Sequence, residues 1–68
     1  MKLFDVVAIR ENLPDRRLVL GQVGTIVDIL DAMHVLVEFA DLDGIAYAIE
    51  PLPLDVLMPL RHEPAIAA

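Results

Sequence analysis

The stretch Leu-Gly-Gln-Val-Gly-Thr-Ile-Val-Asp-Ile-Leu at residues 20–30 decides the fold of this chain. Its two glycines, Gly21 and Gly24, lie three residues apart and open a run of β-branched side chains. Glycine tolerates positive φ and close approach of another backbone, so the pair predicts a turn followed by a bend or bulge in a strand. Valine, threonine and isoleucine then favour a pleated, half-buried strand. A strand that begins in a tight turn and bends at once is typical of a small barrel.

Four other segments have the composition of short strands, which are rich in β-branched and apolar residues. With the stretch above, the predicted strands are Phe4–Ile9, Gln22–Leu30, His34–Phe39, Ile45–Ile49 and Val56–Leu60. Residues 41–44 form a turn in which Gly44 supplies the positive φ, so the third and fourth strands make a hairpin.

Proline restricts the segment that follows the fourth strand. Pro51 and Pro53 cannot donate to a sheet, so residues 50–55 cannot form a central strand. One turn of 3₁₀ helix is expected around Leu52 to Asp55.

These elements predict an all-β fold, a small five-stranded SH3-like barrel with a short 3₁₀ turn before the last strand. We expect residues 1–60 to form this one domain and residues 61–68 to form a flexible C-terminal tail. The strand pattern predicts a core that contains Val7, Ile9, Val23, Ile26, Ile29, Val35, Val37, Phe39, Ile49, Leu57 and Leu60.

The composition is unusually apolar for so short a chain. Of its 68 residues, 57% are apolar, and a domain of this size buries only roughly 60% of its unfolded surface. The excess indicates either a contiguous apolar patch for another protein or a second copy, or else scattered exposed side chains. The chain has no cysteine, which fits a cytoplasmic protein, and we expect neither a signal peptide nor a membrane-spanning segment.

The charge balance disfavours nucleic acid. Five basic residues stand against eleven acidic ones, giving a net charge of −6, whereas binding to phosphates depends on lysine and arginine. Arg10, Arg16 and Arg17 are the one local basic group, and acidic residues lie among them in the sequence.

Few residues could carry catalysis. The chain contains no serine or cysteine, so Thr25, Tyr47 and Lys2 are the remaining hydroxyl and amine candidates. None stands beside a base that a third group could orient, as covalent catalysis requires. We therefore expect no enzyme, no catalytic residue and no cofactor.

A metal site is not expected either. His34 and His62 are the two histidines, and Asp31 could contact His34 in a turn, but a metal needs three or four clustered ligands. The run Asp41-x-Asp43-Gly44 has the spacing of part of a calcium loop, yet the first ligand position would be an aromatic residue. Turn geometry explains these residues sufficiently.

Four acidic residues, Glu38, Asp41, Asp43 and Glu50, fall on or near the predicted hairpin. They form either a negative surface that attracts a basic partner or ordinary surface charge that keeps the protein in solution. The chain has three aromatic residues and no tryptophan, so an aromatic groove for polyproline is not expected. Binding at a strand edge or through an apolar face fits better.

Two resemblances extend this interpretation. The pattern Gly21-x-x-Gly24-x-Ile26-x-x-Ile29 resembles KOW-type modules, although basic flanking residues are missing. A wider set of motifs resembles the small bacterial family catalogued as domain of unknown function 4926. These motifs are Lys2-Leu-Phe-Asp-Val-Val-Ala8, Asn12-Leu-Pro14, Gly21-Gln-Val-Gly-Thr-Ile-Val27, Val37-Glu-Phe39, Asp43-Gly44, Tyr47-Ala48 and Asp55-Val-Leu57. The resemblance implies a short SH3-like protein and brings no activity with it.

The sequence leads to two main functional hypotheses, with small-molecule or ion binding ranked below them. The first is a non-catalytic cytoplasmic module that binds another protein, such as a neighbouring-gene product, in the manner of an antitoxin or immunity protein that neutralises a basic enzyme. The second is a KOW-like accessory factor that contacts RNA or the ribosome. A homo-oligomer is compatible with the first.

Overall fold

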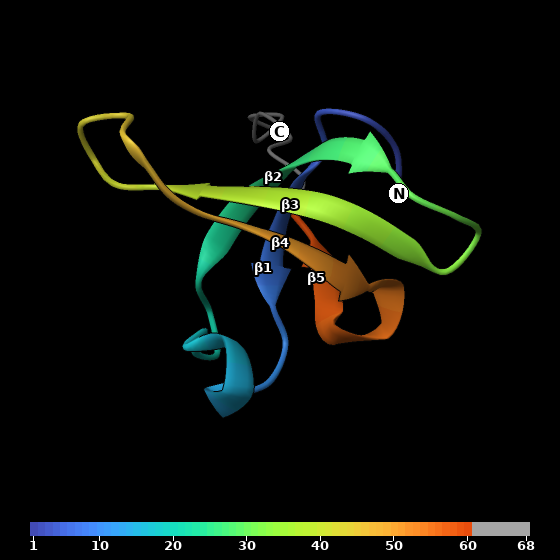
Figure 1. Cartoon of the computed structure of the whole chain (residues 1–68), viewed down its shortest axis with the longest axis horizontal. Coiled ribbons are helices and arrows are strands. Elements are labelled where there is room, and N and C mark those ends of the chain that lie inside the picture. Colours follow the sequence, from blue (N-terminus) through green and yellow to red (C-terminus); the bar gives the residue numbers. More distant parts are fainter. Residues whose placement is uncertain (61–68) are drawn as a thin grey trace, which may run out of the picture.

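A computed structural model describes residues 1–60 of the chain, and the predicted tail at residues 61–68 lies outside the described residues. Within this range the chain forms five strands and two short 3₁₀ helices (Figure 1). In chain order they are β1 (Val6–Ile9), η1 (Pro14–Arg16), β2 (Val23–Ile29), β3 (His34–Ala40), β4 (Ala46–Pro53), η2 (Leu54–Val56) and β5 (Leu57–Pro59).

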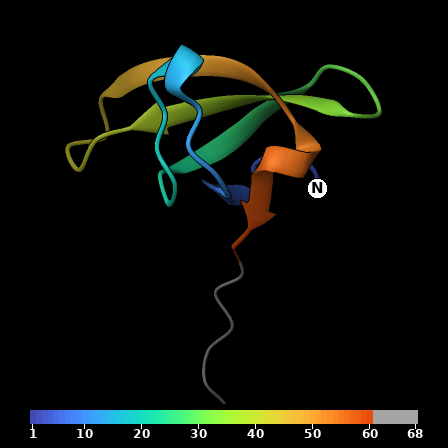
Figure 2. The ribbon, with the colours of Figure 1, turned by 90° about the horizontal axis from the view of Figure 1, so that it is seen from below.

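All five strands belong to one antiparallel sheet with the order β4-β3-β2-β1-β5. The predicted all-β fold is confirmed, and so is the 3₁₀ turn before the last strand. The sheet is strongly curved, and the long loop between β1 and β2 lies on one side of it (Figure 2). The predicted barrel is not closed, because β4 and β5 are the two edges and do not pair with each other. The architecture is a small, open SH3-like sheet.

The first strand is shorter than predicted at its N-terminal end. Phe4 has a φ of 67°, a left-handed conformation that does not continue a strand. The strand therefore begins at Val6, although the Phe4 N–H still donates to the Ile26 carbonyl at 2.8 Å.

The predicted bend in β2 lies farther along the strand than expected. The pairing of β2 with β3 shifts between Ile26 and Asp28, so Val27 is the extra residue of a bulge. A bulge changes which residues face the core. Ile26 and Ile29 consequently lie opposite Val37 and Val35 on the same face.

The fourth strand extends through both prolines to Pro53 and is longer than the predicted Ile45–Ile49. It can include them because β4 is an edge strand, where a missing N–H can face away from the sheet. The 3₁₀ turn follows at Leu54–Val56, two residues later than expected.

Seven of the predicted core residues are buried, but four are exposed to 40% or more. Val23 and Ile49 lie on the opposite face of their strands, whereas Ile29 and Leu60 lie at the margins of the sheet. The exposed four are Val23, Ile29, Ile49 and Leu60; the buried residues missed by the prediction are Ala8, Leu18, Leu52 and Val56.

Leu18 is the most informative of the missed core residues. It comes from the long loop rather than from a strand, and it is 2% exposed. Leu13 and Leu18 exchange two backbone hydrogen bonds, of 2.8 and 3.1 Å. This small bridge folds the loop over the sheet and places the Leu18 side chain in the core.

Candidate functional site

The two faces of the sheet have very different surroundings. One face carries the core, and the other has no layer of the described chain packed against it (Figure 2). We call this second surface the open face. In strand order its residues are Met58 of β5, Val6 and Ala8 of β1, Val23, Thr25 and Asp28 of β2, Leu36 and Glu38 of β3, and Ile49 and Pro51 of β4. Ala8, which lies between Val23 and Met58, is the one of these that is buried, at 4% exposed.

The open face is mainly apolar and is continuous across the sheet. Val6, Val23, Ile49 and Met58 are exposed to 42%, 48%, 53% and 47%. The register places them in neighbouring rows, because Met58 and Val23 both pair with Ala8, and Val6 pairs with Thr25. Residues directly opposite one another on a face are about 5 Å apart. Val6, Val23 and Met58 therefore group around Ala8, and Thr25 and Glu38 lie between this group and Ile49.

Glu38 lies in the middle of this surface. One row of paired residues runs across four strands as Val6, Thr25, Glu38 and Ile49. Glu38 is partly buried by its neighbours, and no hydrogen bond or ion pair within residues 1–60 involves its carboxylate. Its carboxylate thus lies between Thr25 and Ile49, and no cation of the described residues pairs with it.

The four acidic residues predicted as one binding surface do not come together. Glu50 lies opposite Val37 on the core side of the sheet, whereas Glu38 is on the open face. The Glu50 carboxylate is 3.3 Å from Arg16 Nη1, which also donates to the Pro51 carbonyl at 2.7 Å. Glu50 therefore holds the long loop against β4.

Asp41 and Asp43 belong to the turn between β3 and β4. Asp41 Oδ1 accepts hydrogen bonds from the backbone N–H groups of Asp43 at 2.9 Å and Ile45 at 3.0 Å. This arrangement accounts for Asp41 by turn geometry. Leu42 beside them is fully exposed.

The three glycines predicted as turn residues have two different roles. Gly21 and Gly44 have φ of +89° and +79°, as tight turns require. Gly24 instead lies inside β2, where an added Cβ would be 2.6 Å from Val37 Cγ1 and 2.9 Å from the Glu38 carbonyl oxygen. Gly24 is therefore required for close strand packing and not for a turn.

The turn between β2 and β3 brings Asp31 and His34 together. Asp31 Oδ1 lies 2.9 Å from His34 Nδ1 and accepts the Met33 N–H at 2.8 Å. The Met33 hydrogen bond, followed by the His34 contact, lowers the pKa of Asp31 below its ordinary 3.8. No group of three potential metal ligands occurs among the described residues.

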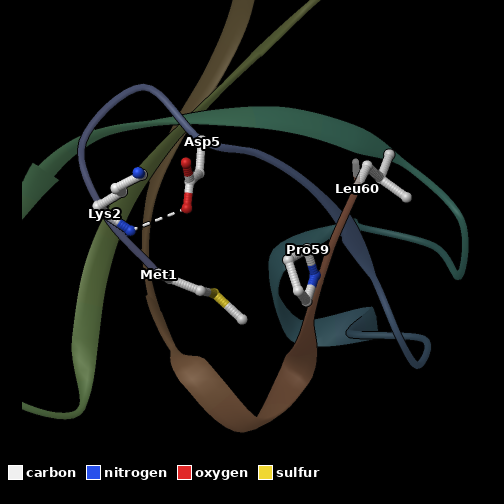
Figure 3. Close-up of a pocket in the computed structure, with 5 residues that line it drawn as sticks. All are labelled: Met1, Lys2, Asp5, Pro59 and Leu60. Atoms are coloured by element: carbon white, nitrogen blue, oxygen red, sulfur yellow. Dashed lines mark hydrogen bonds between the residues drawn. The ribbon is translucent and has the colours of Figure 1, made fainter. Parts of the chain in front are cut away.

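One hollow of about 400 Å³ lies between the N-terminal turn and the end of β5 (Figure 3). It is lined by Met1, Lys2, Asp5, Pro59 and Leu60. The Asp5 carboxylate accepts the backbone N–H of Lys2 at 3.0 Å, so it serves to close the N-terminal turn. The lining offers an amine and a carboxylate but no hydroxyl or imidazole to act with them.

The other candidate nucleophiles lie apart from this hollow. Thr25 is on the open face beside Val6 and Glu38. The Tyr47 ring is tilted relative to the Phe39 ring, and the two ring centroids are 6.4 Å apart. The Tyr47 hydroxyl accepts a hydrogen bond from Gln22 Nε2 at 2.8 Å.

The free edges of the sheet are partly blocked. On β4 the Pro51 carbonyl accepts a hydrogen bond from the Arg16 side chain. The backbone groups of Pro51 therefore point to the side of β4 that faces away from β3. Residues two apart in a strand face the same side, so Pro53 presents its nitrogen there too. After β5 the Leu60 N–H donates a hydrogen bond to the Val6 carbonyl of β1. Because neighbouring residues alternate, the nitrogen of Pro59 faces the free side of the strand. Prolines and short strands are devices that prevent edge pairing.

The comparisons with known proteins identify the family. The family model described as a domain of unknown function (DUF4926) matches residues 3–59. The chain belongs to this family. No curated protein and no solved structure matches it. The family match covers every strand of the sheet and the whole open face.

For this DUF4926 member, the sequence predicted an apolar binding face but did not place it on the sheet. The alternation that defines this face is visible in β3, where Val35, Val37 and Phe39 alternate with Leu36 and Glu38.

In residues 1–60 no helix is long and apolar enough to cross a membrane.

Proposed function

We propose that this protein is a non-catalytic, cytoplasmic module that binds another protein through its open face. One observation carries the proposal: four large apolar side chains, each about half exposed, lie on one face of the sheet, with Val6, Val23 and Met58 around Ala8 and with Ile49 two strands from Val23. A contiguous apolar patch on a small domain is typical of a protein interface. Folding alone does not account for it, since the core lies on the other side of the sheet.

The arrangement of the rest of the surface supports this choice. Prolines restrict pairing at both edges of the sheet, which disfavours a partner that adds a strand. The predicted acidic surface is divided between two faces and a turn. Of the acidic residues, the two strand edges and the open face, the open face supports a binding role best.

The chemistry available in the chain supports a binding role over a catalytic one. The hollow at the N-terminal turn holds an amine and a carboxylate that already bonds its own turn. A general acid–base or nucleophilic mechanism requires a nucleophile within hydrogen-bond reach of its base. No such pair is present among the candidates described above.

A more specific form of the proposal is an antitoxin- or immunity-like protein that neutralises a basic enzyme encoded nearby. Its support is the net charge of −6, which attracts a basic partner and raises its association rate. Co-purification of the neighbouring gene product in a defined stoichiometry would support this form.

Capture experiments with matched variants test the proposal. Ile49→Lys places a charge in the open face, and Val19→Lys places the same charge at a similarly exposed residue of the long loop, 58% against 53%. We expect wild type and Val19→Lys to retain a stoichiometric protein from cell extract and Ile49→Lys to lose it. Equal capture by both variants would contradict the proposal, and so would salt-sensitive capture of RNA in place of a protein.

A further inference from the structure

We propose that Glu38 is the anchor of the open face and that it binds a lysine or arginine of the partner. This inference rests on the proposed function, because it names the chemistry by which the same face selects its partner. The ligand is a segment of another protein that presents one cation between apolar side chains.

The position of Glu38 is the first support. It is the central carboxylate of a row that has Thr25 on one side and Ile49 on the other, with Val6 at the far end. Apolar contacts around a central charged pair exclude water and strengthen the pair. A cation bound here would lie between Ile49 and the Thr25 methyl group, which are the two residues directly opposite Glu38 on the neighbouring strands.

The second support is that its carboxylate makes no hydrogen bond or ion pair within residues 1–60, in contrast to Asp28 on the same face, which accepts the Ile29 N–H at 2.9 Å, and to three other acidic groups of the sheet and its turns. Glu50 is paired with Arg16, Asp41 binds its own turn and Asp31 contacts His34. Within residues 1–60 the Glu38 carboxylate has no such partner. The open face as defined above also contains no lysine or arginine, so the complementary charge has to come from the ligand.

A second copy of this chain does not fit the same surface. A two-fold dimer places the same patch of each copy against the other, which would bring two Glu38 carboxylates to one interface. Each copy also carries a net charge of −6. RNA does not fit either, because phosphates and carboxylates repel each other. Charge complementarity favours a basic, apolar protein segment.

Titration with two short peptides, followed by two-dimensional amide NMR, tests this assignment. The first peptide is Leu-Val-Arg-Val-Leu with blocked ends, and the second has uncharged citrulline in place of the arginine. We expect the arginine peptide to shift the amide signals of Val6, Thr25, Glu38 and Ile49. The citrulline peptide should bind the same residues about tenfold more weakly, because it leaves the carboxylate unpaired.

Two variants that each remove one negative charge provide the matched control. Glu38→Gln should weaken binding of the arginine peptide about tenfold and make both peptides equivalent. Asp43→Asn, at the hairpin turn, should leave the binding of both peptides unchanged. Added salt should weaken the arginine peptide more than the citrulline peptide.

The outcomes separate this inference from the proposed function. If both peptides bind the open face equally in the wild type, the face is a binding surface but Glu38 is not its anchor. If the arginine peptide shifts only residues 41–45 or causes no shift at millimolar concentration, the Glu38 assignment is wrong. Sedimentation that shows a dimer of the chain alone, abolished by Ile49→Lys, would also overturn it, because the occupant of the face would then be a second copy.

Discussion

The two faces of this sheet are built from alternate residues of the same strands, yet they are shaped by different requirements. Along β3, Val35, Val37 and Phe39 are at most 2% exposed, whereas Leu36 and Glu38 between them face outward. The core face is constrained by packing, as Gly24 shows, where not even a methyl group fits. The open face has no such packing, and its half-exposed apolar residues are the basis of the proposed binding role.

Truncation on each face gives the largest contrast. Phe39→Ala leaves a cavity in the core and removes the contact with Tyr47, so we expect it to lower the free energy of unfolding by about 3–5 kcal/mol. Ile49→Ala on the open face should cost about 1 kcal/mol or less, because half of the side chain is already in water. Urea unfolding measures both. Comparable losses at the two positions would mean that the open face is needed for stability.

Glycine substitution tests whether the core face is as closely packed as the structure indicates. Gly24→Ala should lower the free energy of unfolding by about 1–3 kcal/mol, since its methyl group would meet Val37 and the Glu38 carbonyl. Gly44→Ala is the control: it has open space around the new Cβ but a φ of +79°, so it should cost about 1 kcal/mol through backbone strain. Thermal unfolding of both variants checks the difference, and a Gly24→Ala variant as stable as the wild type would contradict the packing.

Glu50 has an ion-pair partner, Arg16, whereas Glu38 has none among the described residues, and substitution of Arg16 tests this difference. Arg16→Met removes the ion pair with Glu50 and the donor to the Pro51 carbonyl, and we expect a loss of about 1 kcal/mol or less in the free energy of unfolding because both side chains are about one-third exposed. Added salt should reduce the difference from the wild type. Arg17→Met serves as the matched control and should be neutral. A larger effect at Arg17 than at Arg16 would show that the loop is held in another way.

The smallest expected effect is at the turn between β2 and β3. Because folding lowers the pKa of Asp31, the ionised carboxylate stabilises the fold above pH 3.8, and this contribution is lost as the pH falls through the lower, folded-state pKa. Asp31→Asn should therefore flatten the pH dependence of stability in this acidic range, and near neutral pH, where the carboxylate is ionised, it should lower the stability slightly by an amount that does not vary with pH. Thermal unfolding across the acidic range measures it, and a variant whose pH profile matches the wild type would contradict the role of this turn.

Much of the fold could be predicted from residue patterns, and the exceptions have physical causes. The β-branched runs and the turn glycines placed all five strands, because strand composition and positive φ are local properties. The face of each residue was harder to predict. Val23 and Ile49 were assigned to the core since they are large and apolar, but the alternation of residues along their strands places both on the other face. Leu18 reaches the core from a loop, and the two-residue alternation of a strand cannot identify a buried residue in a loop.

The candidate site could be predicted only in part for a related reason. The four acidic residues are neighbours in sequence on a hairpin, but opposite faces of a strand pair separate Glu38 from Glu50. The partner of Glu50 is Arg16, thirty-four residues away. Such a pairing follows from the packing of the long loop on β4 and leaves no local signal in the sequence.

The central claim is that the open face is the surface that meets another protein. Cross-saturation NMR of the isotope-labelled chain in complex with its captured, unlabelled partner tests it most directly. The account predicts the strongest saturation transfer at Val6, Thr25, Glu38 and Ile49, with the turn at residues 41–45 and the loop at residues 10–20 unaffected. Saturation centred on that turn or that loop, with the four open-face residues unaffected, would contradict it.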